Sequence, residues 1–68
     1  MIFIELTDSN DWSRKFILRA DLIEKIVPSR SNTAEILLTT GRWASCLEGV
    51  ATIMRLIKDA TENGATDE

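Results

Sequence analysis

Apolar and polar residues alternate in several short stretches before residue 45. In residues 2–7, Ile2, Ile4 and Leu6 fall on one side of the chain and Phe3 on the other. A period of two with branched and aromatic residues is typical of half-buried β-strands. The pattern predicts strands over residues 2–7, 14–19 and 34–39, a strand or bend over 23–27, and a last strand beginning at 42–44.

Polar or turn-forming residues separate these stretches. Residues 8–13 are mostly short polar side chains that bond their own backbone, which is typical of loops. Residues 20–22 interrupt the alternation, Pro28 cannot donate to a strand ladder, and Gly41 permits a tight turn. Short strands joined by such turns indicate an antiparallel β-meander.

The pattern after residue 44 predicts one helix. Ser45 and Glu48 have the S-x-x-E spacing of a capping box, in which each side chain satisfies a backbone N–H of the first turn. We expect the helix over about residues 46–62, with Asn63 and Gly64 as its stop. The fold class is therefore α+β, an antiparallel meander of three to five short strands followed by one C-terminal helix packed on the sheet. Residues 1–62 form the single domain, and residues 63–68 form a polar flexible tail.

The expected helix has a wide apolar surface. Its apolar residues span roughly twice the stripe of just over 100° that an ordinary surface helix shows. We expect Val50, Met54 and Ile57 to pack on the sheet. The remaining apolar residues are then left to contact another chain: Ile53, Leu56 and Ala60.

The strands carry a similar excess of apolar residues. If the helix covers the side of Ile4 and Leu6, then Phe3, Ile17 and Leu37 lie on the opposite face. A half-solvated antiparallel sheet normally has polar residues there, so these three are candidates for an interaction patch. The alternative is that the small sheet curls and brings some of them into one core.

Composition favours self-association. The chain has 68 residues, one cysteine, no histidine and a net charge of −3. So short a chain has a thin core and usually gains stability from a disulfide, a metal or a partner chain. A single cysteine without histidine excludes an internal disulfide and the common zinc sites, so a homodimer is expected. The first residues lack a signal peptide and no apolar run reaches the roughly 20 residues of a membrane span, so a cytoplasmic location is expected.

No combination of residues indicates catalysis or cofactor binding. Without histidine, Cys46 and the serines have no imidazole base, and Cys46 is interpreted as structural. Asp8 and Asp11 lack the spacing of a calcium-binding loop. We therefore expect a non-enzymatic protein without metal or cofactor.

Trp12 is a further candidate for a binding contact. It lies in a polar loop with no local cover, and tryptophan is enriched at interface hot spots. Six basic residues in the strand region, together with Trp12 and Trp43, leave open a weak single-stranded nucleic-acid-binding surface. Interspersed acidic residues and the negative net charge argue against nucleic acid as the partner.

The order of residues resembles a known family. The matching positions are Met1-Ile2, Leu6-Thr7, Phe16-x-Leu18, Asp21-Leu22-Ile23-Glu24-x-Ile26, Thr33-x-x-Ile36-x-Leu38-x-x-Gly41 and Glu48-x-Val50-x-x-Ile53. Over residues 1 to about 58 the chain resembles the FlbD-like (SwrD-like) small flagellar and swarming-motility proteins of bacteria. The resemblance implies a strand-rich body with a C-terminal helix, no catalytic residues and an accessory role. The chain departs from the family in its acidic first loop with Trp12 and in having Thr40-Gly41 at the later turn.

Two functional hypotheses remain besides nucleic-acid binding. The first is a self-associating protein–protein interaction module that binds a larger assembly through a strand edge or the outer helix face. The second is a small acidic, phage-type inhibitor or adaptor of a basic, nucleic-acid-processing partner. The acidic loop around Asp8 and Asp11 and the C-terminal Asp67 and Glu68 motivate this second hypothesis.

Overall fold

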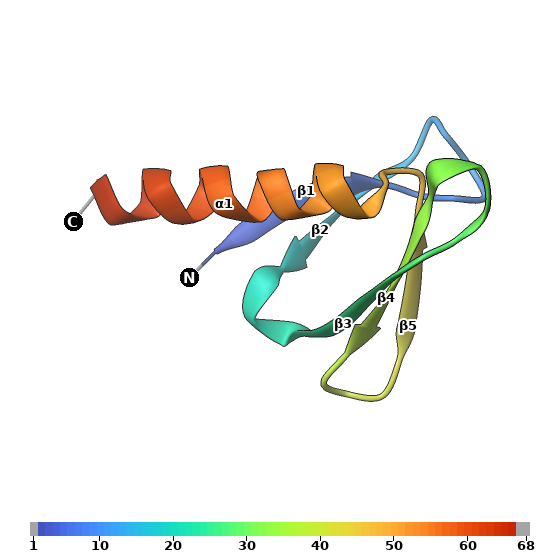
Figure 1. Ribbon diagram of the computed structural model, residues 1–68, viewed down its shortest axis with the longest axis horizontal. Helices are drawn as coiled ribbons and strands as arrows, with labels where there is room; N and C mark the ends of the chain where they lie inside the picture. The colour runs from blue at the N-terminus through green and yellow to red at the C-terminus, as the bar shows by residue number, and fades with distance from the viewer. Residues whose placement is uncertain (1, 67–68) are drawn as a thin grey trace.

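The computed structural model describes the backbone of residues 2–66 and the side chains of residues 2–62. Five antiparallel strands precede one helix, which confirms the predicted α+β class. Figure 1 shows the helix along one side of the molecule and the strands beneath it. The elements are β1 (Phe3–Thr7), β2 (Lys15–Arg19), β3 (Ile23–Pro28), β4 (Ala34–Leu38), β5 (Trp43–Cys46) and α1 (Val50–Thr66).

The strands form two sheets, one of β1 and β2 and one of β3, β4 and β5. A 3-10 turn over Ala20–Leu22 separates them, at the place where the alternation of the sequence was interrupted. A second 3-10 turn, Arg30–Asn32, connects β3 to β4, and the left-handed Gly41 (φ 92°) lies between β4 and β5. The predicted meander is therefore divided between two sheets by its second connection.

Backbone hydrogen bonds join the two sheets at one end, and a short turn of the chain joins them at the other. At one end the N–H of Leu47 donates to the carbonyl of Thr7 (3.0 Å), and Asp8 forms an isolated bridge with Cys46. At the other end the Ala20–Leu22 turn connects β2 to β3, and the N–H of Thr39 donates to the carbonyl of Leu22 (2.8 Å), which extends the β3–β4 pairing. The strands thus curl around one core, which is the alternative that the sequence left open for the small sheet.

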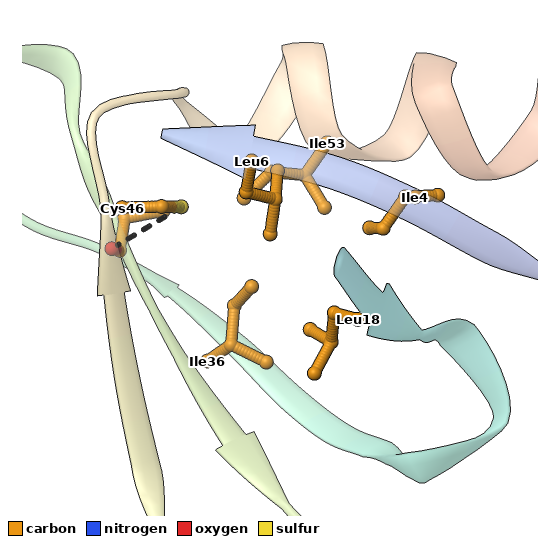
Figure 2. Close-up of a cluster of buried hydrophobic side chains, with 7 residues drawn as sticks. Ile4, Leu6, Leu18, Ile36, Cys46 and Ile53 are labelled. Carbon is orange, nitrogen blue, oxygen red and sulfur yellow. Dashed lines mark hydrogen bonds between the residues drawn. The ribbon is translucent and has the colours of Figure 1, made fainter. Parts of the chain in front are cut away.

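The core lies between the two sheets and beneath the helix (Figure 2). Each strand of the β1–β2 hairpin sends alternate side chains inward, as period two requires. Leu6, Ile36, Cys46 and Ile53 have no exposed surface. Among the side chains that the structure describes, the buried set is Ile4, Leu6, Leu18, Ala34, Ile36, Cys46 and Ile53.

The predicted capping box is wrong. Ser45 lies in β5, opposite Glu35 of β4, because the β4–β5 pairing continues as far as Ala34 and Cys46. The first helical hydrogen bond runs from the N–H of Ile53 to the carbonyl of Gly49 (3.0 Å), so the helix begins after Gly49. The S-x-x-E spacing matches a capping box by chance, because Ser45 lies near the end of β5 and Glu48 lies in the loop before α1.

The side of the helix that faces the core also differs from expectation. Ile53 was expected on the outer surface but is fully buried, while Met54 was expected inside but is 56% exposed. Leu56 and Ala60 are half-buried and pack against the core rather than remaining uncovered. The helix contacts strands of both sheets, β1 of one and β3 of the other, and Val50 and Ile57 also pack against the core. The wide apolar surface is therefore largely explained within the monomer.

The helix continues through the predicted stop at Asn63 and Gly64 to Thr66. These residue types tolerate the left-handed conformation of a helix end but do not impose it. Asp67 and Glu68 of the predicted tail lie outside the described residues. Across residues 2–66, no helix has both the length and the apolar character needed to cross a membrane.

Candidate interaction surface

The outer face of the β1–β2 hairpin carries two exposed apolar side chains. Phe3 is 50% exposed and Ile17 is 62% exposed. In the register, Phe3 lies opposite Arg19 and Ile17 lies opposite Glu5, so Phe3 and Ile17 are diagonal neighbours on one face. Diagonal side chains on an antiparallel pair lie within reach of each other. Together they form an apolar patch on a face that solvent-exposed hairpins normally fill with polar residues.

Charged residues surround this patch in a defined pattern. Glu5 lies between Phe3 and Thr7 on β1, and Lys15 and Arg19 flank Ile17 on β2. Arg19 forms a bidentate pair with Asp21, with Nη2 of Arg19 2.7 Å from Oδ2 of Asp21. This hydrogen bond is the main reason that the pKa of Asp21 is lowered and that of Arg19 is raised. Among the described residues, Glu5 and Lys15 form no such ion pair. We call Phe3, Glu5, Lys15, Ile17 and Arg19 the outer hairpin face.

The loop between β1 and β2 holds Trp12 in solvent. Asp8 Oδ1 accepts from the N–H of Asn10 (2.9 Å), and Asp11 Oδ1 accepts from the N–H (3.0 Å) and hydroxyl (2.6 Å) of Ser13. The Ser13 hydroxyl, then its N–H, lowers the pKa of Asp11. Both carboxylates thus order the loop backbone, while Trp12 is 79% exposed.

Leu37 lies on a different surface from Phe3 and Ile17. It is half-buried on the outer side of the three-stranded sheet, where it pairs with Lys25 on one side and Trp43 on the other. The core separates this side from the outer hairpin face, so the three residues do not form the single patch that the alternation suggested. Trp43 is 54% exposed and borders a shallow groove that Phe16 and Asp8 also line.

The exposed side of the helix is mainly polar. Its exposed residues between positions 51 and 62 include Arg55, Lys58 and Asp59, and Met54 is its one large exposed apolar side chain. The groove beside the helix start, next to Asn32 and Gly49, has no charged lining residue. Apart from this groove, the exposed side of the helix offers less for an apolar contact than the outer hairpin face.

Cys46 is buried and its thiol is held in the protonated form. Burial is the main reason that its pKa is raised, and the nearby Glu48 carboxylate raises it further. The thiol lies 3.7 Å from the carbonyl oxygen of Ala34, the contact drawn in Figure 2. A protonated, enclosed thiol is a poor nucleophile. Within residues 2–66, no group of three or more acidic or cysteine side chains is placed to hold a metal ion.

The basic residues do not gather on one surface. Lys15 and Arg19 lie on the outer hairpin face, whereas Lys25 lies on the outer side of the other sheet. Trp43 is on the side of Lys25, across the core from Lys15. A single-stranded nucleic acid needs a basic groove lined with aromatic side chains along one path. This arrangement does not favour that function.

No family model, curated protein or solved structure matches this chain. The candidate surface is therefore identified only from the exposure, register and charge of its own residues. Sequence reasoning placed Phe3 and Ile17 on an outward face but did not include Glu5 and Lys15. Their place follows from the alternation once the hairpin register is known, because each is two positions from an exposed apolar residue on its own strand.

Proposed function

We propose that this chain is a non-enzymatic protein–protein interaction module that self-associates through the outer hairpin face. The observation that carries the proposal is the exposure of Phe3 and Ile17 as diagonal neighbours on a hairpin face. Apolar patches with a charged border are typical of surfaces that contact other proteins. The small size of the chain adds a reason, since a partner supplies burial that 68 residues cannot.

The assembly that the module serves is proposed from the family resemblance. FlbD-like proteins are small accessory proteins of bacterial flagellar and swarming systems, and a cytoplasmic accessory role for this chain agrees with them. In that role the outer hairpin face would bind a second copy of the chain, and another surface would contact the larger assembly. Trp12 and Trp43 are exposed, are not among the residues of the outer hairpin face, and are available for the second contact.

The self-association is tested by recording amide ¹H–¹⁵N spectra over a dilution series. We expect concentration-dependent shifts in β1 and β2, greatest near Glu5 and Ile17, with the exposed turns of α1 around Lys58 as an internal reference. Shifts gathered in the helix, with β1 and β2 unchanged, would place the contact elsewhere. Spectra that do not change with concentration would contradict the proposed self-association.

The Trp12 loop supports a second candidate function, an acidic adaptor that docks on a basic partner. Trp12 is 79% exposed and directly follows Asp11, and the Asp8 and Asp11 carboxylates accept from backbone N–H groups of the loop. An ordered aromatic with acidic neighbours suits a contact to a basic surface. Titration of an arginine-rich peptide into wild type and Trp12→Ala tests this function. Equal affinity of wild type and Trp12→Ala for the peptide would contradict a role of the Trp12 loop in binding a basic partner.

A further inference from the structure

The backbone of β2 carries hydrogen-bonding groups that no described residue satisfies. At the start of the hairpin ladder the N–H of Asp8 donates to the carbonyl of Arg14 (2.9 Å). Bonded and non-bonded pairs alternate along an antiparallel ladder, so every second residue of β2, beginning with the one after Arg14, points its N–H and C=O away from β1. These residues are Lys15, Ile17 and Arg19. Among the described strands β2 pairs with β1 alone, so this edge of the hairpin is open.

The other three outer edges of the two sheets are obstructed. On β1, the outward N–H of Thr7 donates to Oε1 of Glu48, and α1 contacts the strand (Figure 1). On β5, the carbonyl of Ser45 accepts from the N–H of Ser9 (3.4 Å). On β3, a register shift lies near one end and Pro28, which has no N–H, lies at the other. Prolines and bulges are common means of closing an edge strand, and β2 has neither.

The side chains along the open edge are apolar at its centre and basic at its ends. Ile17, in the middle of β2, is 62% exposed. The strand has two basic residues and no acidic one. Arg19 is paired with Asp21, whereas Lys15 forms no ion pair with any described residue. Glu5 lies opposite Ile17 on β1, which is the side away from the open edge.

We infer that β2 accepts an acidic, extended segment of another protein as the third strand of this hairpin sheet. Added antiparallel, the segment pairs the free N–H and C=O groups of β2, as in strand addition to an exposed sheet edge. It places a carboxylate opposite Lys15 and an apolar side chain opposite Ile17. The main-chain bonds fix the extended conformation of the segment, and the lysine selects its charge.

The charges of β2 argue against a second copy of the same strand as the occupant. Antiparallel pairing over the full strand centres on Ile17 and sets Lys15 opposite Arg19 of the second copy, once at each end. Like charges directly opposite each other destabilise a strand pair. A lysine on an edge therefore discourages pairing with strands of its own charge and leaves an acidic strand as the matching occupant.

The inference rests on the proposed interaction module and names a class of partner for it. It does not require self-association, because strand addition uses the backbone of β2, whereas the outer hairpin face uses side chains. The two contacts can therefore be tested separately.

A short acidic peptide, acetylated and amidated Glu-Thr-Val-Thr-Glu, is the probe. Amide ¹H–¹⁵N spectra are recorded at one fixed protein concentration while the peptide is added, since a five-residue strand is expected to bind with a dissociation constant of roughly millimolar. The amides of Lys15, Ile17 and Arg19 gain hydrogen bonds and should shift most. The amides of Phe16 and Leu18 point toward β1 and should shift less.

Two altered peptides test the chemistry on the wild-type protein. Lys-Thr-Val-Thr-Lys should bind about fivefold or more weakly, because it places a cation opposite Lys15. The acidic peptide with an N-methylated central valine should not bind measurably, because it loses the N–H that pairs with Ile17 and gains a methyl group at the edge. These two comparisons do not depend on the folding of any variant.

Two pairs of variants test the same edge from the side of the protein. Ile17→Pro removes an N–H that β1 does not use, and proline is tolerated at such edge positions. We expect it to bind the acidic peptide about fivefold or more weakly than Ile17→Thr, which keeps the N–H. Lys15→Glu should prefer the basic peptide, whereas Lys58→Glu makes the same charge change on the exposed side of the helix and should behave as wild type. The ¹H–¹⁵N spectrum of each variant verifies its fold.

Shifts that are absent from β2, equal binding of the acidic and basic peptides, or full binding of the N-methylated peptide would each overturn the inference. The dilution series for self-association contains no peptide and gives a separate answer. A dimer that binds no peptide would leave the proposed self-association standing without the inference. A monomer that binds the acidic peptide along β2 would support the inference and contradict the self-association.

Discussion

Both carboxylate oxygens of Glu48 accept hydrogen bonds from Thr7. The backbone N–H of Thr7 donates to Oε1 (2.9 Å) and its hydroxyl donates to Oε2 (2.8 Å). The two residues are 41 positions apart in the sequence, and the contact is partly buried. It joins the end of β1 to the loop before α1, so the side chain assigned to a helix cap connects the hairpin to the helix instead.

Replacing Glu48 by alanine should destabilise the fold by about 1–3 kcal/mol, because a partly buried backbone N–H and hydroxyl lose a charged acceptor. Thr7→Val removes only the hydroxyl contact and should cost less. Urea unfolding followed by circular dichroism measures both. Glu35→Ala, at an exposed strand position, is the control and should change the free energy of unfolding little. A loss for Glu48→Ala no larger than that of the control would contradict the role of this contact.

Neighbouring residues on the helix should respond very differently to truncation. Ile53 is fully buried and Met54 is 56% exposed. Ile53→Ala should lower the free energy of unfolding by about 2–5 kcal/mol through the cavity it leaves. Met54→Ala should change it by less than about 0.5 kcal/mol, as is usual for surface positions. Similar losses for the two variants in denaturant unfolding would mean that the helix faces the core with a different side.

Gly49 has no room for a side chain. A Cβ at this position would lie 2.8 Å from the carbonyl oxygen of Asn32, a backbone atom that cannot rotate away. We expect Gly49→Ala to lower the melting temperature because the loop or the helix start must shift. Gly41→Ala is the comparison, since its Cβ meets nothing within 4 Å but its φ of +92° strains any other residue. A Gly49→Ala protein as stable as wild type would contradict this expectation and would mean that the loop over residues 29–33 shifts at little cost in free energy.

The buried thiol predicts a loss of stability at high pH. The pKa of Cys46 is raised above its ordinary value of 9.0 in the folded state, so the unfolded chain releases the thiol proton first. The contribution of Cys46 to stability is complete below about pH 9 and declines as the pH rises through the folded pKa. The difference in free energy of unfolding between wild type and Cys46→Ala should therefore shrink between neutral and alkaline pH. A constant difference across this range would argue against a thiol that is buried in its neutral form.

The alternation of residues predicted the strands because each one buries a single face, and a period of two records that burial directly. Residues 20–22 were recognised as a break for the same reason. The helix start was missed because Ser45 and Glu48 match a local motif, while their actual partners, Glu35 and Thr7, are distant in sequence. The side of the helix that faces the core depends on how the two sheets surround it, which a helical wheel does not contain. Alternation alone placed Phe3 and Ile17 on an outward face, but it also grouped Leu37 with them, because it does not show that the strands form two sheets.

The central claim is that the outer hairpin face holds two copies of the chain together. Sedimentation equilibrium over a range of micromolar concentrations, on wild type, Ile17→Glu and Met54→Glu, tests it most directly. Both variants place a carboxylate at an exposed apolar position, so they differ in location and not in chemistry. We predict a concentration-dependent dimer for wild type and Met54→Glu and a folded monomer for Ile17→Glu. A dimer that survives Ile17→Glu but is lost in Met54→Glu, or a wild type that is monomeric throughout, would contradict the account.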